Sequence, residues 1–273
     1  MQKGFTPNGT YIMIGIFDSG LGGLTALKEL RKLCPECDIV YFGDTGRVPY
    51  GTRSKNILLR YADEDIRFLL SKGADRILAA CGTVSSVALP HIEKKYPVKV
   101  TGVVKAAARE AVAATKTKKI GVIGTGATIS SGAFSREIAA LDSSAEVVEV
   151  ACPLFVPLVE NGFIEKNCEI TSLAVAEYLA KIKDFGADTL ILGCTHFPII
   201  AGHIADYLGE GVKLINSGSA AAHELYSFCK DMGGNGKTEI YVSDNPANFE
   251  SVAKIFLDSD TLPSIHTVEI DKI

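Results

Sequence analysis

Short apolar segments alternate with helix-forming segments along almost the whole chain, and this alternation is the strongest constraint on its fold. Most of the apolar segments lack a strict apolar–polar alternation, as expected of strands covered by helices on both faces. Regular alternation of strands and helices predicts α/β sheets of the doubly wound, parallel type. The predicted strands are rich in Ile, Val and Leu and lie at 13–17, 39–42, 76–80, 98–103, 120–124, 146–150, 189–192, 212–215 and 239–242.

Helices are expected between these strands. The chain has 273 residues and 47% hydrophobic content, which is enough for one large core or two moderate ones. No low-complexity linker interrupts it, so a boundary between two units is expected in compact loops near Val104 and Ser217. The predicted helices lie at 24–33, 56–70, 105–115, 170–183, 220–230 and 247–257, the last after a capped start with proline in its first turn.

Composition narrows the classes of partner and compartment. The net charge is −4 and the Lys and Arg residues are scattered, which argues against nucleic acid or an anionic membrane as the main partner. The apolar runs have the length of strands, so we expect no membrane span. Residues 1–12 lack the pattern of a secretion signal and are interpreted as a short polar extension. The seven cysteines form no disulfide framework, so we expect a cytoplasmic protein.

Two cysteines stand in matching positions, each directly after a predicted strand. Cys81 follows the apolar residues 78–80, Cys194 follows 190–193, and a threonine comes within two residues of each. Ligands of doubly wound sheets bind beyond the carboxyl ends of the strands, so both thiols are expected at that edge. Two thiols at equivalent strand ends favour a site with a proton carrier on each side of a substrate, as a racemase requires.

Other strand ends add short polar groups to the same edge. Asp18 and Ser19 lead into the glycine turn 20–23, whose backbone N–H groups are free to bind an anion. Basic side chains are few there, so we expect hydroxyl and backbone N–H groups to hold a carboxylate ligand. The remaining candidates follow other strands or lie in nearby turns: Pro49, Tyr50, Gly51, Gly82, Thr83, Thr125, Thr128, Glu160, Thr195 and His196.

Other cysteines have a structural interpretation. A buried cysteine usually behaves as a small hydrophobic residue, and this is our interpretation of Cys152, Cys168 and Cys229. Cys34 and Cys37 form a C-x-x-C pattern, but it ends a predicted helix and no second pair completes a zinc site. A redox or metal role is therefore disfavoured for this pair.

Some of the candidate site residues have alternative explanations. Asp18 is compatible with a turn-stabilising carboxylate, His196 with a structural histidine and Glu160 with a solvated carboxylate. The glycine-rich turns at 20–23 and 124–126 do not complete a dinucleotide-binding fingerprint, because the third glycine is missing at the required spacing. A nucleotide-dependent dehydrogenase is therefore disfavoured.

Several motifs, taken together and in order, resemble those of the glutamate racemase family within the aspartate/glutamate racemase superfamily. The resemblance implies a cofactor-independent enzyme that interconverts L- and D-glutamate, supplies D-glutamate for peptidoglycan, and forms a homodimer. The motifs extend over about residues 13–225 and are Phe17-Asp18-Ser19-Gly20, Gly43-Asp44-Thr45, Arg47-x-Pro49-Tyr50-Gly51, Ala80-Cys81-x-Thr83, Pro157-Leu158-Val159-Glu160 and Gly193-Cys194-Thr195-His196-Phe197-Pro198.

The same resemblance implies an architecture. Two α/β domains would face each other, with the active site in the cleft between them. The first domain would comprise residues 13–104 plus 217–273 and the second residues 105–216, because the C-terminal segment returns to the first.

The resemblance also assigns roles to the site residues. Cys81, assisted by Asp18, would take the proton from D-glutamate, and Cys194, assisted by His196 with Glu160 behind it, would take it from L-glutamate. A thiol has an ordinary pKa of about 8.5, so near neutral pH it can serve as thiolate and thiol in turn. No metal is implied. The substrate-binding residues would be Asp18, Ser19, Pro49, Tyr50, Gly51, Gly82, Thr83, Thr125, Thr128, Thr195 and His196.

Gly82 departs from the family pattern, in which Asn is usual at this position. The glycine removes a side-chain amide expected to contact the substrate and adds backbone freedom beside the thiol. Loss of one hydrogen bond to a charged ligand group costs about 1.5–3 kcal/mol if nothing replaces it. Smaller departures are Gly46 for the usual Ala and Asn216 where Asp is more usual.

Two other hypotheses stay open. The first is a related two-cysteine racemase or isomerase acting on aspartate, a hydantoin or another small acid. The second is a binding protein on the same fold with little catalysis, although a binding protein has no need of two opposed thiols. Because both thiols, Thr83 and the Cys-Thr-His triplet at 194–196 are intact, we expect an active enzyme.

Overall fold

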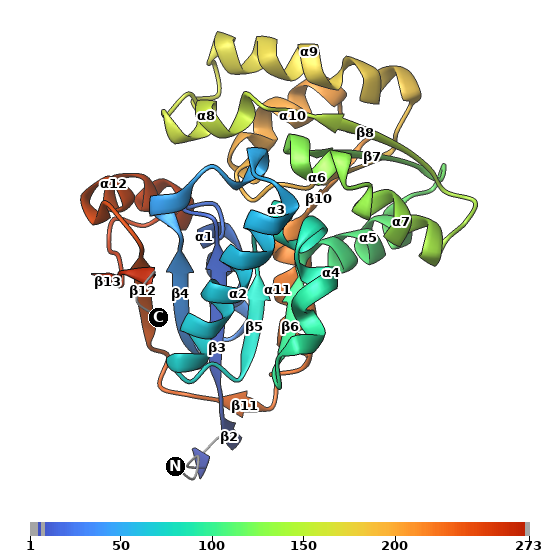
Figure 1. Cartoon of the computed structure of the whole chain (residues 1–273). Coiled ribbons are helices and arrows are strands. Elements are labelled where there is room, and N and C mark those ends of the chain that lie inside the picture. Colours follow the sequence, from blue (N-terminus) through green and yellow to red (C-terminus); the bar gives the residue numbers. More distant parts are fainter. Residues whose placement is uncertain (1–4, 7–8, 271–273) are drawn as a thin grey trace.

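The computed structural model describes residues 5–6 and 9–270, and its largest sheet has six strands in the order β13-β12-β4-β3-β5-β6 (Figure 1). All neighbouring strands in this sheet run parallel. The strands are β3 (Met13–Asp18), β4 (Asp38–Gly43), β5 (Arg76–Ala79), β6 (Lys99–Gly102), β12 (Thr238–Val242) and β13 (Ser264–Thr267). We call this sheet and the helices packed on it lobe 1.

A second parallel sheet has four strands in the order β10-β9-β7-β8, and with its helices it forms lobe 2. Its strands are β7 (Lys119–Gly124), β8 (Glu146–Ala151), β9 (Thr189–Leu192) and β10 (Lys213–Asn216). The predicted class, an α/β protein with doubly wound parallel sheets, is therefore confirmed. β12 and β13 come last in the chain and pair beside β4, so the C-terminal segment returns to lobe 1.

Helices connect successive strands and cover the sheets. The longer ones are α1 (Leu24–Leu33), α2 (Lys55–Ser71), α5 (Val103–Ala114), α7 (Ala133–Leu141), α9 (Glu169–Phe185), α10 (Ala201–Leu208), α11 (Ser217–Ser227) and α12 (Pro246–Leu257). Short helical turns are η1 (Thr45–Arg47), η2 (Tyr50–Thr52), α3 (Gly82–Val87), α4 (Leu89–Ile92), η3 (Glu93–Lys95), α6 (Gly126–Ser130), α8 (Phe155–Glu160) and η4 (Phe197–Ile200).

The predicted helices are present, and their ends differ by a few residues. The largest difference is α11, which was predicted at 220–230 and begins at Ser217. The Asn216 side chain accepts hydrogen bonds from the N–H groups of Gly218 and Ser219, at 3.0 and 3.1 Å, and this cap starts the helix earlier. No helix among the described residues is long and apolar enough to cross a membrane.

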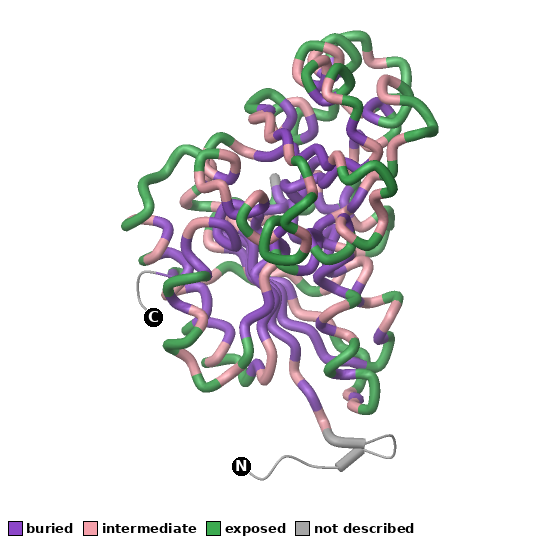
Figure 2. Tube along the Cα trace, turned by 90° about the vertical axis from the view of Figure 1, so that its right-hand side faces the viewer, coloured by how far each residue is buried: buried purple, intermediate pink, exposed green. Residues whose placement is uncertain are grey.

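The central strands of lobe 1, β3, β4 and β5, are buried on both faces, as their composition predicts, whereas the edge strand β13 is mostly exposed. Ile14 and Ile16 of β3 point to the side covered by α1 and α11, whereas Phe17 points to the opposite side, covered by α2. Figure 2 shows the central strands as largely buried segments, with exposed residues on the outer helices. The core beside α1 and α11 continues through α5 into lobe 2, so one apolar cluster joins the two sheets.

A small third sheet was not predicted. It has the order β1-β2-β11, with β1 (Phe5–Thr6), β2 (Gly9–Tyr11) and β11 (Met232–Gly233). Strands of two or three residues carry no readable pattern, which is why the sequence indicates only a polar extension here. The Tyr11 hydroxyl donates a hydrogen bond of 2.8 Å to Asp38 at the start of β4 and ties this segment to lobe 1.

The cysteine pair near the end of α1 corrects one expectation. Cys34 and Cys37 are joined by a disulfide, whereas the sequence indicates reduced cysteines without a redox role for this pair. The turn after α1 brings their Cα atoms to 5.5 Å, a normal distance for a disulfide. The other five cysteines are free, namely Cys81, Cys152, Cys168, Cys194 and Cys229, and all but the half-buried Cys168 are buried.

Gly15 is a tight point in the packing of α2 on β3. A Cβ atom at this position would lie 3.0 Å from Ala74 Cβ and 3.0 Å from Leu69 Cδ1. We expect Gly15→Ala to lower the free energy of unfolding by about 1–3 kcal/mol, the usual cost of overpacking, measured by chemical denaturation. The control is Gly202→Ala in α10, where a Cβ would meet no atom within 4 Å and where stability should stay level or rise. Equal stability of the two variants would contradict the packing described.

Candidate active site

The two thiols lie at the junction of the lobes. Cys81 directly precedes α3 and is 5% exposed, and Cys194 lies two residues beyond β9 and is 7% exposed. α3 packs against α5, α6 and α7, so the helix that begins beside one thiol lies on the junction with lobe 2 (Figure 1). A Cβ atom on Gly82 would lie 3.7 Å from the Cα atom of Cys194. The structure therefore brings the two predicted thiols together from two sheets.

Cys81 sits in a buried, acidic environment. Its Sγ atom donates to Ser19 Oγ at 3.6 Å. Burial first, and then the Asp18 carboxylate, raise the pKa of Cys81 to about 12, against the opposing effect of the Val84 N–H. The structure thus favours the protonated thiol at this position.

Asp18, at the end of β3, is completely buried beside this thiol. Its Oδ2 atom accepts a hydrogen bond of 3.0 Å from the Gly20 N–H, while its buried Oδ1 atom has no hydrogen-bond partner among the described residues. Burial raises the pKa of Asp18, and His196 and the Gly20 N–H act in the opposite direction. A buried oxygen with a free lone pair is costly unless a partner arrives, so Asp18 Oδ1 is suited to receive a donor from a ligand.

Cys194 belongs to a chain of three side chains. Its Sγ atom lies 3.9 Å from His196 Nδ1, and His196 Nε2 lies 2.9 Å from Glu160 Oε1 at the end of α8. Burial alone would lower the pKa of His196, but hydrogen bonds to Cys194 and Glu160 outweigh it and raise the pKa to about 10. The rings of His196 and Phe256 of α12 pack in a T-shaped arrangement, with 5.3 Å between their centroids. The imidazolium form is therefore favoured beside Cys194.

Hydroxyl groups link the lobes around the thiols. Thr83 Oγ1 of α3 lies 3.0 Å from Thr125 Oγ1, which lies 3.0 Å from Thr128 Oγ1 in α6. On the other side, Thr25 Oγ1 donates to the Thr195 carbonyl at 3.3 Å. The three threonines at 83, 125 and 128 and Thr195 were predicted, whereas Thr25 was not, because nothing in its local sequence distinguishes it from a core helix residue.

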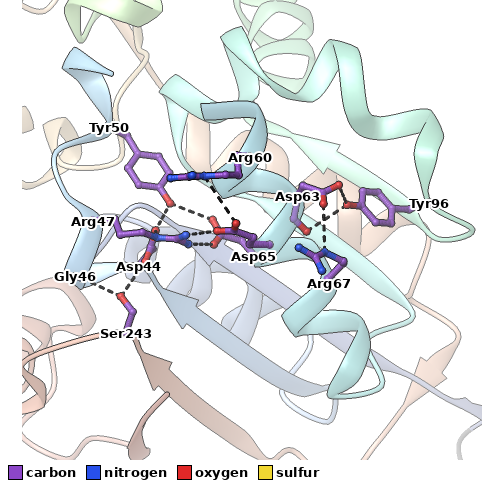
Figure 3. A network of polar contacts seen from close by, with 11 residues as sticks. Asp44, Gly46, Arg47, Tyr50, Arg60, Asp63, Asp65, Arg67, Tyr96 and Ser243 are labelled. Carbon is purple, nitrogen blue, oxygen red and sulfur yellow. Dashed lines mark hydrogen bonds and ion pairs between the residues drawn. The ribbon is translucent and has the colours of Figure 1, made fainter. Parts of the chain in front are cut away.

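The loop 45–52 is the part of the site that the sequence explained least. Tyr50 is buried, Pro49 is exposed, and Gly51 lies against lobe 2, where a Cβ would be 3.0 Å from Thr125 Cβ. Figure 3 shows that Arg47 fixes this loop by reaching one carboxylate directly after β4 and others on α2.

Arg47 contacts Asp44 at 2.6 Å, Asp65 at 3.0 Å and Glu64. The Tyr50 hydroxyl donates to Asp44 and lies 3.3 Å from Asp65, which is completely buried. Burial and the neighbouring Asp44 raise the pKa of Asp65 well above its usual value, against the opposing effect of Arg47. The network joins the loop to α2 through charge and hydrogen bonds together.

Asp44 and Arg47 belong to a recognised motif, but no sequence pattern indicates that they pair with Glu64 and Asp65. These carboxylates lie within a long amphipathic helix, where acidic residues normally face water. Among the residues that the structure describes, no three His, Cys, Asp or Glu side chains form a group suited to hold a metal ion.

Fold and site together define an α/β protein in which two parallel sheets bring two buried thiols together at their junction, one of them near Asp18 and the other beside His196. The chain belongs to the Asp/Glu/Hydantoin racemase family, whose model matches residues 32–225. The resemblance inferred from the motifs is therefore confirmed.

Individual relatives are similar over most of their length. The chain is 47% identical to the glutamate racemase of Aquifex aeolicus, covering 92% of this chain and 96% of the relative. Identity to the glutamate racemase of Geobacter metallireducens is 42%, covering 89% and 92% respectively.

Solved structures of glutamate racemases are also similar to this chain in fold. A glutamate racemase isoform from Bacillus anthracis superposes with a TM-score of 0.89 at 32% identity, covering 94% of this chain and 97% of that one. The glutamate racemase of Francisella tularensis, solved with D-glutamate, gives 0.88 at 36% identity, covering 96% and 99%. An aspartate racemase from Picrophilus torridus, at 20% identity and a TM-score of 0.58, covers 80% of this chain and 94% of that one and shares the fold alone.

The Arg47 network leads to a stability prediction. Arg47→Met removes the guanidinium that balances a group of buried carboxylates and should lower the free energy of unfolding by about 3–5 kcal/mol in urea denaturation. Asp65→Asn should cost much less, because an amide keeps the size and the hydrogen-bonding oxygen of the carboxyl group and removes a charge that burial disfavours. The control is Arg53→Met, at an exposed arginine directly after η2. A large loss in Asp65→Asn together with no loss in Arg47→Met would contradict the network.

His196 leads to a pH prediction. Its pKa is 6.5 in the unfolded chain and about 10 in the folded protein, so the folded state holds a proton that the unfolded state releases. The resulting stabilisation is complete below about pH 6.5 and is lost as the pH rises towards about 10. The difference in unfolding free energy between wild type and His196→Gln should therefore shrink between about pH 6 and pH 10. A difference between wild type and His196→Gln that stays constant over this pH range would refute the assignment.

Proposed function

We propose that this protein interconverts L- and D-glutamate by a two-base mechanism, with Cys81 and Cys194 on opposite faces of the substrate α-carbon. The observation that carries the proposal is the meeting of two buried thiols from two sheets, each next to a separate acid–base partner. Support for glutamate comes from relatives named glutamate racemase, one of them solved with D-glutamate. One base cannot reach both faces of a carbon, so inversion needs two.

The charges of the site suggest a direction for each proton. The Cys194 thiolate, stabilised by the His196 imidazolium, takes the α-proton of L-glutamate, and the electron pair stays on the α-carbon. The Cys81 thiol then donates its proton to the opposite face, which yields D-glutamate, a Cys194 thiol and a Cys81 thiolate. The reverse reaction begins from this second state, and proton exchange between the thiols and solvent restores the first.

Asp18 completes the Cys81 side. Once Cys81 has given up its proton, a buried thiolate stands beside a buried carboxyl group, and the two negative charges repel each other. The free Oδ1 of Asp18 is suited to accept a hydrogen bond from the α-ammonium group of the substrate, which also brings positive charge to the thiolate. Substrate binding would therefore stabilise the Cys81 thiolate, which the empty site disfavours.

Carbanion formation is the difficult step, because an α-proton is far less acidic than a thiol. Each 1.4 kcal/mol of differential stabilisation of the transition state raises the rate about tenfold. We assign the substrate carboxylates to preorganised donors, which need no reorganisation during the reaction. These donors and their neighbours are Ser19, Pro49, Tyr50, Gly51, Gly82, Thr83, Thr125, Thr128 and Thr195.

The biological setting is part of the same proposal. D-glutamate is a precursor of peptidoglycan, and its synthesis from L-glutamate belongs in the cytoplasm. We propose that the functional units are residues 13–104 with 217–273, and residues 105–216, and that the protein acts as a homodimer. Size-exclusion chromatography with light scattering would test the dimer.

The reaction is tested in D2O with separate samples of L-glutamate, D-glutamate and L-aspartate. Optical rotation should decay for both glutamate enantiomers, with one deuterium entering the α-position. Cys81→Ala and Cys194→Ala should each lower racemisation by at least about 10²–10⁴-fold, the usual contribution of one acid–base group. Cys229→Ala, at a buried cysteine remote from the junction, is the control. Near-normal turnover in either active-site variant would refute the two-base assignment, and turnover of aspartate alone would refute the substrate.

A further inference from the structure

The segments that carry the two thiols meet at a pair of glycines. Gly82 directly follows Cys81, and Gly193 directly precedes Cys194. A Cβ atom built on Gly82 would lie 2.1 Å from the Gly193 carbonyl oxygen and 3.2 Å from the carbonyl carbon. Real Cβ contacts are not found below 3.0 Å, and the obstructing atom belongs to the backbone, so no side chain can rotate away. Any residue except glycine at position 82 is therefore excluded at this separation.

Gly193 is held in place by residues of lobe 2. Its N–H donates to the Ile123 carbonyl of β7 at 2.7 Å. A Cβ atom on Gly193 would lie 2.7 Å from the same carbonyl oxygen and 3.0 Å from Phe134 Cε2. Phe134 is completely buried in lobe 2. The peptide that faces Gly82 is therefore fixed by a strand and by the core.

Gly82 is held in place by the hydrogen bonds of α3. It is the first residue of α3, and the Ser85 N–H donates to the Cys81 carbonyl at 2.9 Å. Ser85 Oγ donates to the Ala79 carbonyl at 2.8 Å and accepts the Val103 N–H at 3.1 Å. α3 is thus tied to β5 and to the start of α5. Neither glycine can move away alone, so a larger residue 82 would separate the lobes.

We propose that Gly82 is a positioning residue that sets how closely the two thiol-bearing segments approach each other across the substrate; this inference rests on the proposed racemase function. The peptide contact between Gly82 and Gly193 acts as the limit of closure. The Thr83–Thr125 hydrogen bond of 3.0 Å forms at the same closure, directly beside it. The Asn expected at position 82 from the family resemblance has no room at this separation.

The size of the effect follows from the geometry. Moving the Gly193 oxygen from 2.1 Å to an acceptable 3.0–3.4 Å requires the segments to part by about 1 Å. A displacement of this size in an active site can cost about 10²-fold in rate. The thiol that removes the proton moves with its own lobe, but the opposite thiol then stands too far away to deliver one. Inversion should therefore suffer more than proton removal.

The experiment compares Gly82→Ala and Gly82→Asn with Gly126→Ala. Gly126 is also the first residue of a short helix at the junction, but a Cβ there would meet no atom within 4 Å. In D2O, Gly82→Ala should lower kcat for racemisation by about 10–100-fold with a smaller change in KM. Deuterium should appear in glutamate that has kept its configuration, because the variant slows the exchange of the α-proton with solvent less than it slows inversion. Gly126→Ala should match wild type in kcat and in the ratio of exchange to inversion.

A second measurement does not depend on turnover. Alkylation by iodoacetamide, followed by peptide mass spectrometry, reports the accessibility of Cys81 and Cys194. Both should react about tenfold faster in Gly82→Ala than in wild type or Gly126→Ala, while Cys168 reacts equally in all three, because separating buried segments admits the reagent. Circular dichroism establishes that each variant is folded.

The outcomes separate the two proposals. Wild-type kcat, exchange ratio and alkylation rate in Gly82→Ala would overturn the closure limit while the racemase function stands. Faster alkylation in Gly82→Ala, combined with a wild-type protein that does not racemise glutamate, would uphold the closure limit and overturn the substrate. A loss of kcat without any change in exchange ratio or alkylation would mean that Gly82 acts on the fold alone, which also overturns the proposal.

Discussion

The exclusion of water at the junction of two sheets is the constraint on which the rest of the site depends. Cys81, Cys194 and Asp18 are all buried there, and burial gives their charges an influence that water would screen. The same burial keeps Cys81 as a thiol, whereas the hydrogen-bonded chain from Glu160 through His196 favours a positive charge beside Cys194. Two thiols of identical chemistry are thus made unequal by their surroundings. A reaction that needs one acid and one base starts from this inequality.

Different interactions hold the different parts of the site in place. Each thiol lies two residues beyond a buried strand, Cys81 after β5 and Cys194 after β9, so the two sheets set the positions of the thiols. The loop 45–52 contains no strand, and it is held instead by the ion pairs of the Arg47 guanidinium with three carboxylates. Beside the thiols, glycine and threonine make close contacts across the junction, because these small residues let the two segments approach. Precision in this site therefore comes from small residues on rigid elements.

The sequence predicted the sheets and the strand-end residues because both are local patterns. Apolar runs give the strands, and parallel strands place their carboxyl ends on one edge, so the order of residues alone was enough to group Cys81, Asp18 and Cys194. Partners brought together by tertiary packing were not predictable. Asp65 has no local signal, and the closeness of Gly82 to Gly193 depends on the relative position of two sheets. The Cys34–Cys37 disulfide was misjudged because a short C-x-x-C spacing does not report the geometry of its turn.

The return of the C-terminal segment to lobe 1 has a consequence for synthesis. β12 pairs with β4, Ser243 Oγ donates to Asp44, and Phe256 covers His196. These residues are synthesised after β3, β4 and β5 and after the strands of lobe 2, at about 5–20 residues per second. Until β12 and α12 have been made, the nascent chain carries an unpaired strand edge on β4 and an uncovered histidine. The cover of His196 is thus acquired late, and a chain that stops before β12 keeps an exposed sheet edge.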